Sequence, residues 1–218
     1  MTLLLLFDLD GTLTDSRRGI AECIRHALGE LGHRAPPDGE LTKYIGPPLA
    51  ASFATLLGTS DPVVIDQAIA IYRDRYDKVG ILENDVYAGI REALVALAEA
   101  GHQMHVVTAK PRPYAVRIVE HFGLADLFAS VHGPELSDRH YTKAALIKKA
   151  RAGARGPDAL MIGDRADDVY AAREAGVGAI GVTWGYGTRA ELEDAGADAL
   201  IESPAALVRH VVRSVAFR

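Results

Sequence analysis

Cysteine is almost absent from this chain: of 218 residues, Cys23 is the only one. One cysteine cannot form an intrachain disulfide, and it cannot supply the cysteine ligands of a structural zinc site. Chains that fold without disulfides are typical of reducing compartments. We therefore expect a cytoplasmic protein.

Long hydrophobic runs and basic blocks are missing as well. The apolar run at residues 3–7 is shorter than the core of a signal peptide, about 7–15 residues, and far shorter than a bilayer span of about 20. The net charge is -5, and lysine and arginine form no stripe. Membranes and nucleic acids are therefore poor candidate partners.

Hydrophobic residues make up 49% of the chain and charged residues 24%, which is enough apolar material for a large core. A chain of this length forms one large domain, or one core with a smaller insertion. Residues 3–7 predict a strand that is buried on both faces. Residues 16–80 predict only helices, and strands and helices alternate from about residue 89 onward.

Strands separated by helices are typical of a doubly wound parallel sheet, so we expect an α/β, Rossmann-like fold. We place this core in residues 1–15 and 81–218. The all-helical stretch, residues 16–80, follows the first strand and predicts an inserted α-helical domain.

Polar residues follow the expected strands at the points where the strands end. Open parallel sheets bind ligands at the carboxyl ends of their strands, so these residues should meet at one edge. Lys143, near the start of a helix, is expected at the same place. The residues that follow the strands are Asp8 and Asp10 after the first, Thr108 after the strand at 105–107, and Asp164 and Asp168 after the strand at 159–162.

Several carboxylates beside one lysine and one hydroxyl favour phosphate chemistry with a metal ion. Crowded carboxylates repel one another unless a cation lies among them. Oxygen ligands suit a hard ion, and Mg²⁺ also shares the phosphate oxygens of a substrate. A carboxylate can itself attack phosphorus and become an aspartyl-phosphate.

The stretch from Phe7 to Ser16, FDLDGTLTDS, resembles the first motif of the haloacid dehalogenase-like superfamily of phosphohydrolases. Thr108, Lys143 and residues 163–168 fall where its second, third and fourth motifs belong. The resemblance spans nearly the whole chain. Residues 163–187 are most similar to the phosphoglycolate phosphatase-like branch, in which a helical cap follows the first motif, as residues 16–80 do here.

This resemblance implies a role for each matching residue. Asp8 is the expected nucleophile, and Asp10 the acid that protonates the leaving oxygen and later activates water. Mg²⁺ is expected on Asp8, the Asp10 carbonyl and Asp164, with Asp168 supporting the metal. The residues expected to bind the substrate phosphate, or to shape the turn beside it, are Gly11, Thr12, Thr108, Ala109 and Lys143.

Two positions depart from the family pattern. Ala109 stands where many relatives have asparagine, which leaves only its backbone amide to bind phosphate. Lys143 is not followed by proline, so Lys110 is a rival for the phosphate lysine. Elsewhere, Trp184 and Tyr186 are interpreted as packing and loop residues. The loop at residues 44–48, with Lys43 beside it, either faces the substrate or is an ordinary exposed turn.

The expected function is a Mg²⁺-dependent phosphatase of small phosphomonoesters. Phosphoglycolate is the leading substrate by resemblance, and a 5'-nucleotidase, a pyrophosphatase and a phosphomutase are alternatives. A phospho-accepting receiver-type signalling module is the alternative of another class, although it has no place for an inserted helical lobe. The expected partner is a small phosphorylated metabolite, and the protein is a monomer or a homodimer.

Overall fold

The computed structural model describes residues 2–138, 140–152 and 158–216. The chain divides into two compact units. The first, here called the α/β unit, comprises Met1–Thr14 and Val86–Arg218, and the second, the helical unit, comprises Asp15–Asp85.

The second boundary lies five residues later than the sequence placed it. Residues 81–85 pack with the helical unit because Glu83 is bound to it twice. Arg75 forms an ion pair with the Glu83 carboxylate at 2.8 Å, and the Gly19 N–H donates to the Glu83 carbonyl at 3.0 Å.

The α/β unit is built on a six-stranded sheet in the order β5-β4-β1-β6-β7-β8. Every pairing in it is parallel, which confirms the predicted doubly wound α/β class. The strands are β1 (Leu4–Phe7), β4 (Gln103–Val107), β5 (Ser130–His132), β6 (Ala159–Gly163), β7 (Gly178–Val182) and β8 (Ala199–Ile201).

Strand β1 lies in the middle of this sheet, and all four of its residues are buried. Its last residue, Phe7, lies opposite Val106 of β4 and Ile162 of β6. The three strands therefore end at nearly the same level, and the residues that follow them emerge at one edge of the sheet.

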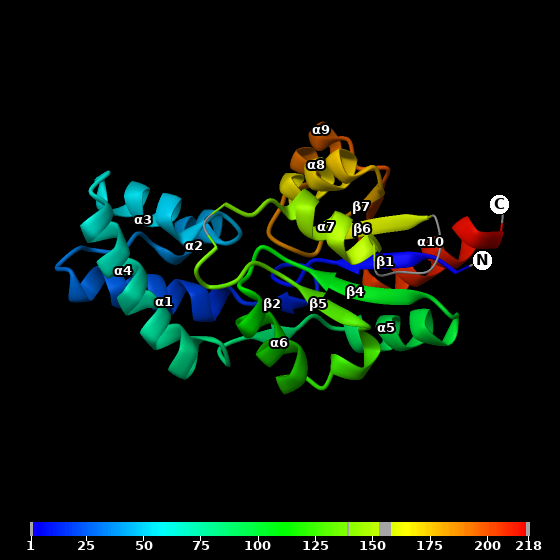
Figure 1. Cartoon of the computed structure of the whole chain (residues 1–218), viewed down its shortest axis with the longest axis horizontal. Helices are drawn as coiled ribbons and strands as arrows, with labels where there is room; N and C mark the ends of the chain where they lie inside the picture. Colours follow the sequence, from blue (N-terminus) through cyan, green and yellow to red (C-terminus); the bar gives the residue numbers. More distant parts are fainter. Residues whose placement is uncertain (1, 139, 153–157, 217–218) are drawn as a thin grey trace. The chain divides into compact units, whose positions relative to one another are not determined.

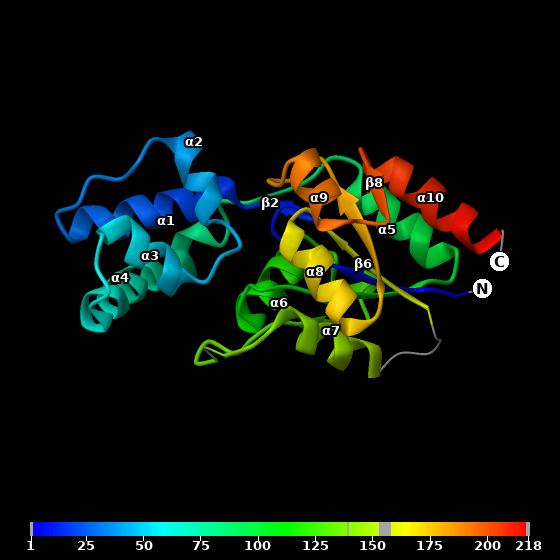
Figure 2. The same ribbon diagram turned by 90° about the horizontal axis from the view of Figure 1, so that it is seen from above.

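Helices cover both faces of the sheet (Figures 1 and 2). The α7 and α8 helices pack together over one face, where Ile147 and Val169 join Leu4 and Met161 in a buried cluster. The α5 and α10 helices pack against each other on the other face. The helices of this unit are α5 (Ile90–Glu99), α6 (Arg112–His121), α7 (Lys143–Ala152), α8 (Ala166–Ala175), α9 (Arg189–Ala195) and α10 (Pro204–Ala216).

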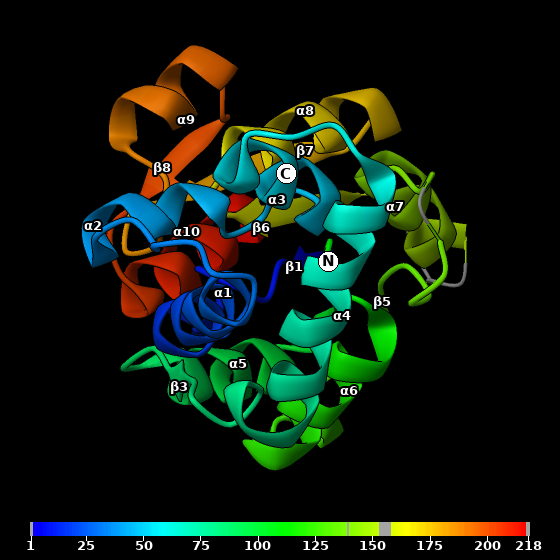
Figure 3. The ribbon, with the colours of Figure 1, turned by 90° about the vertical axis from the view of Figure 1, so that its left-hand side faces the viewer.

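In the helical unit, α4 packs against α1 and α3 (Figure 3). Asp61 caps α4, because its carboxylate accepts a hydrogen bond from the Val63 N–H at 2.9 Å, and proline follows at the first helical position. The helices are α1 (Arg17–Glu30), α2 (Asp38–Leu41), the 3-10 helix η1 (Thr42–Tyr44), α3 (Leu49–Leu57), α4 (Pro62–Arg75) and the π-helix η2 (Tyr76–Gly80).

Two short strands stand where the chain passes from one unit to the other. They are β2 (Thr14–Asp15) and β3 (Asp85–Val86), which pair as a two-stranded sheet that the sequence did not predict. Across the described parts of the chain, no helix has the length and apolarity that crossing a membrane requires.

Candidate active site

Three buried carboxylates meet at the carboxyl edge of the sheet. Asp8 follows β1, Asp164 follows β6, and Asp168 lies in the first turn of α8. They are 7%, 0% and 2% exposed, respectively, and one oxygen of each lies within 4.8 Å of the others. The Arg165 N–H donates to Asp168 Oδ2 at 3.1 Å, which fixes that carboxylate at the start of its helix.

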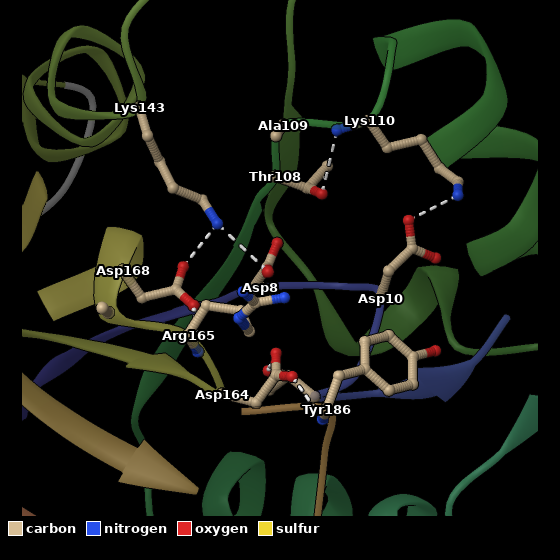
Figure 4. Close-up of polar contacts among 12 residues, drawn as sticks. Asp8, Asp10, Thr108, Ala109, Lys110, Lys143, Asp164, Arg165, Asp168 and Tyr186 are labelled. Carbon is tan, nitrogen blue, oxygen red and sulfur yellow. Dashed lines mark hydrogen bonds and ion pairs between the residues drawn. The ribbon is translucent and has the colours of Figure 1, made fainter. Parts of the chain in front are cut away.

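Lys143, the first residue of α7, brings one positive charge to these acids (Figure 4). Its Nζ lies 3.1 Å from Asp8 Oδ2 and also bonds Asp168 Oδ1. Three carboxylates and one ammonium leave the group, here called the carboxylate cluster, with an excess of negative charge in a buried place. Such an excess is costly unless a cation binds.

The carboxylate cluster fits a divalent metal ion. Asp8 Oδ1 is buried and finds no hydrogen-bond partner among the described residues. An unpaired buried acceptor of this kind is rare in folded proteins and calls for a ligand. Every oxygen on offer is a hard donor, which suits an ion such as Mg²⁺ rather than a thiophilic metal.

Burial changes the protonation of these groups. It raises the pKa of Asp8 from 3.8 to about 6, against the opposing effect of Lys143. Burial, together with the charges of Asp168 and Asp8, raises the pKa of Asp164 to about 7. Burial disfavours the charged form of Lys143, but the Asp168 and Asp8 carboxylates outweigh it and raise the pKa of this lysine. The lysine therefore stays charged, while protons compete with any metal ion for the carboxylates.

Asp10 stands apart from the cluster with a lysine of its own. Its Oδ2 lies 2.5 Å from Lys110 Nζ, and the two side chains are 14% and 6% exposed. Figure 4 shows this pair beside the cluster, joined by a separate contact. Asp10 Oδ1 is buried and has no hydrogen-bond partner among the described residues. The sequence left Lys110 and Lys143 as alternative candidates for the phosphate-binding lysine. In the structure both reach the site, where Lys110 pairs with Asp10 and Lys143 pairs with the cluster.

The other residues expected at the site lie around it. Thr108 is 2% exposed, and its Oγ1 accepts a hydrogen bond from the Lys110 N–H at 3.2 Å. The Ala109 carbonyl accepts from the Tyr141 hydroxyl at 3.2 Å. Thr12 donates through Oγ1 to Asp164 Oδ1 at 3.2 Å, so its hydroxyl is engaged with a carboxylate of the cluster.

Gly11 is required at its position for two reasons. Its φ is +88°, which side chains rarely tolerate, and a Cβ there would lie 2.3 Å from Asp164 Oδ2. Glycine at this position therefore lets the first-motif loop approach the carboxylate cluster more closely than a residue with a side chain would permit.

Sequence reasoning missed a support for Asp164 in residues 184–187, which follow β7. The Tyr186 N–H donates to Asp164 Oδ2 at 2.7 Å, and the indole Nε1 of Trp184 donates to the Thr12 carbonyl at 3.0 Å. A Cβ on Gly185 would lie 2.3 Å from the Gly11 carbonyl and 2.4 Å from Asp164 Cβ. Residues 184–187 therefore hold Asp164 against the first-motif loop. The signal was present in the two glycines, Gly185 and Gly187, placed just beyond a strand end.

The site thus combines a cluster of buried carboxylates, an adjacent lysine, a buried hydroxyl and a further acid paired with a second lysine. Comparison with known proteins agrees with that chemistry. A family model described as haloacid dehalogenase-like hydrolase matches residues 5–182. A crystal structure of a predicted phosphatase from Clostridium acetobutylicum superposes with a TM-score of 0.90 and 36% identity, covering 98% of this chain and 99% of that one.

Curated relatives align with most of the chain. A 5'-nucleotidase of Pseudomonas aeruginosa is 40% identical over 190 residues, which cover 86% of each protein. A phosphoglycolate phosphatase of Vibrio parahaemolyticus is 30% identical over 194 residues, 84% of each. Tyrosine-protein kinase PtkA of Mycobacterium tuberculosis is 38% identical over 194 residues, but these cover 88% of this chain and only 65% of that longer protein.

Proposed function

We propose that this chain hydrolyses a small phosphomonoester with Mg²⁺ through an aspartyl-phosphate on Asp8. The chain belongs to the haloacid dehalogenase-like hydrolase family and is a phosphatase. The observation that carries the proposal is the surroundings of Asp8. Its Oδ1 is buried and unpaired among the described residues, and two further buried acids and Lys143 lie beside it. A phosphatase has sustained turnover, so the receiver-type alternative loses its support.

In this proposal Asp8 attacks phosphorus and the phosphorus–oxygen bond to the alcohol breaks. Asp10 donates a proton to the departing oxygen, then takes a proton from the water that hydrolyses the aspartyl-phosphate. Lys143 neutralises charge on the transferring group, and Thr108 with the Ala109 amide holds its oxygens. Lys110 keeps the Asp10 side chain oriented.

Asp8, Asp164, Asp168 and the Asp10 carbonyl would hold Mg²⁺, which when bound offsets the negative charge of both the cluster and the phosphate. Thr12 and the Tyr186 N–H, which bond the two oxygens of Asp164, keep that ligand oriented. The buried all-oxygen donor set supports this assignment.

The names of the relatives support two substrate candidates. Phosphoglycolate is the first candidate, and a nucleoside 5'-monophosphate is the second because the relative that is 40% identical is named a 5'-nucleotidase. We propose that the helical unit is the cap that selects among them and that the enzyme acts in the cytoplasm. The insertion of a second compact unit directly after the first motif supports the cap assignment.

The test is a phosphate-release screen with Mg²⁺ over 2-phosphoglycolate, nucleoside 5'-monophosphates, pyrophosphate and sugar phosphates. Asp8→Asn should abolish turnover, a loss of at least about 10³-fold, because an amide cannot act as the nucleophile. Asp167→Asn is the matched control: the exposed neighbour of Asp168 should keep wild-type activity. Wild-type activity in Asp8→Asn, with an unchanged melting temperature, would refute the proposal.

A further inference from the structure

A second concentration of charge lies in the helical unit. It lines a cavity of about 340 Å³, which is at the lower end of the size range of small-molecule sites, about 300–1,000 Å³. The lining residues are Arg17, Arg18, Glu22, Arg25, Gly39, Thr42 and Ile45. We call it the arginine cavity.

Helical spacing places the charged residues on one wall of the cavity. Arg18, Glu22 and Arg25 are separated by four and then three residues on α1, so they share a face of the helix. Gly39 of α2 and Thr42 of η1 contribute to the lining from the segment that follows α1. Ile45, from the loop that the sequence singled out at residues 44–48, is buried and also lines the cavity.

The charges around the arginine cavity do not balance. Arg17 is held by Asp15, with Nε 2.9 Å from Oδ1, and Arg25 NH1 lies 2.6 Å from Glu22. The Arg18 side chain is exposed and makes no hydrogen bond or ion pair with any other described residue. The lining therefore holds three guanidinium groups and a single carboxylate.

The position of this excess on the helix increases its attraction for anions. Arg17 and Arg18 are the first two residues of α1, whose first turn contains no acidic residue. The Asp15 carboxylate, just before the helix, accepts a hydrogen bond from the Arg17 N–H at 3.2 Å and leaves Arg18 without an acid. The amino end of a helix carries partial positive charge, so cations there are normally disfavoured and an anion is favoured. Guanidinium groups also match the geometry of phosphate and carboxylate oxygens better than any other side chain.

We propose that the arginine cavity binds the phosphate or carboxylate group of a small molecule, with Arg18 as its principal cation. That anionic group has two possible sources. It is either a second anionic group on the substrate itself, or a free anion that acts as an effector. The proposal does not rest on the phosphatase mechanism, because anion binding beside α1 can be measured in the absence of enzymatic turnover.

The test is a titration of the full-length protein with inorganic phosphate in metal-free buffer, followed by the backbone amide signals of residues 17–25 in NMR spectra. These signals should shift saturably in the parent protein. Arg18→Gln should weaken the apparent affinity about tenfold, the size expected for a lost charge-assisted hydrogen bond. Reversing the charge with Arg18→Glu should remove saturation altogether.

The matched control is Arg34→Gln, which removes an exposed arginine from the same unit but outside the cavity lining. It should bind phosphate as the parent does. The proposal is overturned if the amides of residues 17–25 do not shift saturably, or if both Arg18 variants bind phosphate like the parent. Because Arg18 has no partner among the described residues, neither variant should unfold the protein.

Kinetics then distinguish the two sources of the anion. If the substrate supplies it, Arg18→Gln should raise KM for 2-phosphoglycolate, whose leaving group carries a carboxylate, and leave KM for 4-nitrophenyl phosphate unchanged. If a free anion supplies it, Arg18→Gln should remove the response of 4-nitrophenyl phosphate hydrolysis to added sulfate. Arg34→Gln should do neither.

Discussion

The carboxylate cluster and the Asp10–Lys110 pair lie at the same edge of one sheet, yet their charges are balanced differently. The cluster has three acids and one lysine, while Asp10 is paired with Lys110. The cluster therefore needs a further cation, and the pair does not. In the proposed mechanism this difference separates two tasks, metal-dependent attack in the cluster and proton transfer at the pair. Variants of the two regions should therefore respond differently to Mg²⁺.

Among the changes that separate the two regions, the largest effect is expected from Lys143→Met. Loss of the cation that faces Asp8 and Asp168 should lower kcat by about 10²–10³-fold, as for other preorganised donors to a transition state. The same change should tighten Mg²⁺ binding, because a competing positive charge leaves the acids. Isothermal titration calorimetry beside steady-state kinetics measures both quantities. Weaker Mg²⁺ binding in this variant would contradict the charge balance that we describe.

The second prediction concerns pH. The pKa values of Asp8 and Asp164 are raised from 3.8 to about 6 and about 7. In the metal-free protein the stability associated with these groups is fully present below about pH 4 and is lost as the pH rises through these values. Mg²⁺ binds the ionised forms, so its affinity should rise about 500-fold between pH 5 and pH 7, because the ionised fraction grows about tenfold for Asp8 and about fiftyfold for Asp164 over that range.

Calorimetric Mg²⁺ titrations at several pH values test this directly, and the increase in melting temperature on adding Mg²⁺ should also grow with pH. A metal affinity that stayed constant from pH 5 to pH 8 would show that these carboxyls do not bind the ion.

A third change tests how Asp164 is held. Gly185→Ala forces a Cβ against the Gly11 carbonyl and Asp164. Mg²⁺ affinity should fall by about 10–100-fold, as it does when the support of a metal ligand is disturbed. Gly29→Ala is the matched control, because a Cβ there meets nothing within 4 Å. Equal Mg²⁺ affinities in the two variants would mean that residues 184–187 do not position the ligand.

The smallest effect is expected from Lys110→Met. It should lower kcat by about tenfold, which is a part of the roughly 10²–10⁴-fold that a positioned proton donor contributes. The Mg²⁺ dissociation constant should stay unchanged. Comparison with Lys143→Met in the same two assays separates the regions. If Lys110→Met altered metal affinity as much as Lys143→Met does, the cluster and the pair would have to be treated as one electrostatic unit.

The sheet and the meeting of Asp8, Thr108 and Asp164 could be predicted because parallel topology alone brings strand ends together. Contacts that depend on side-chain reach could not. Lys110 is attached close to Thr108, yet its long side chain ends on Asp10, and no spacing rule specifies that direction. The support of Asp164 by Tyr186 is a backbone contact across 22 residues, for which the sequence carried only a glycine pattern.

The boundary after the helical unit lies five residues later than the sequence placed it for a related reason. Helical periodicity ends near residue 80, but the Arg75–Glu83 ion pair keeps the next residues with the helical unit. The arginine cavity was missed because a stripe of charge on a helix usually faces solvent. Only the segment from α2 to Ile45 turns that stripe into the wall of a cavity.

The pairing of β2 with β3 gives the helical unit a narrow connection to the rest of the chain. Since the two strands are neighbours in a small sheet of their own, the first and last residues of the inserted segment stand side by side. Such an insertion can be lengthened, shortened or replaced as a cassette without changing the register of the six main strands. With the helical unit as the cap that we propose, substrate specificity can diverge between relatives while the phosphoryl-transfer chemistry stays constant.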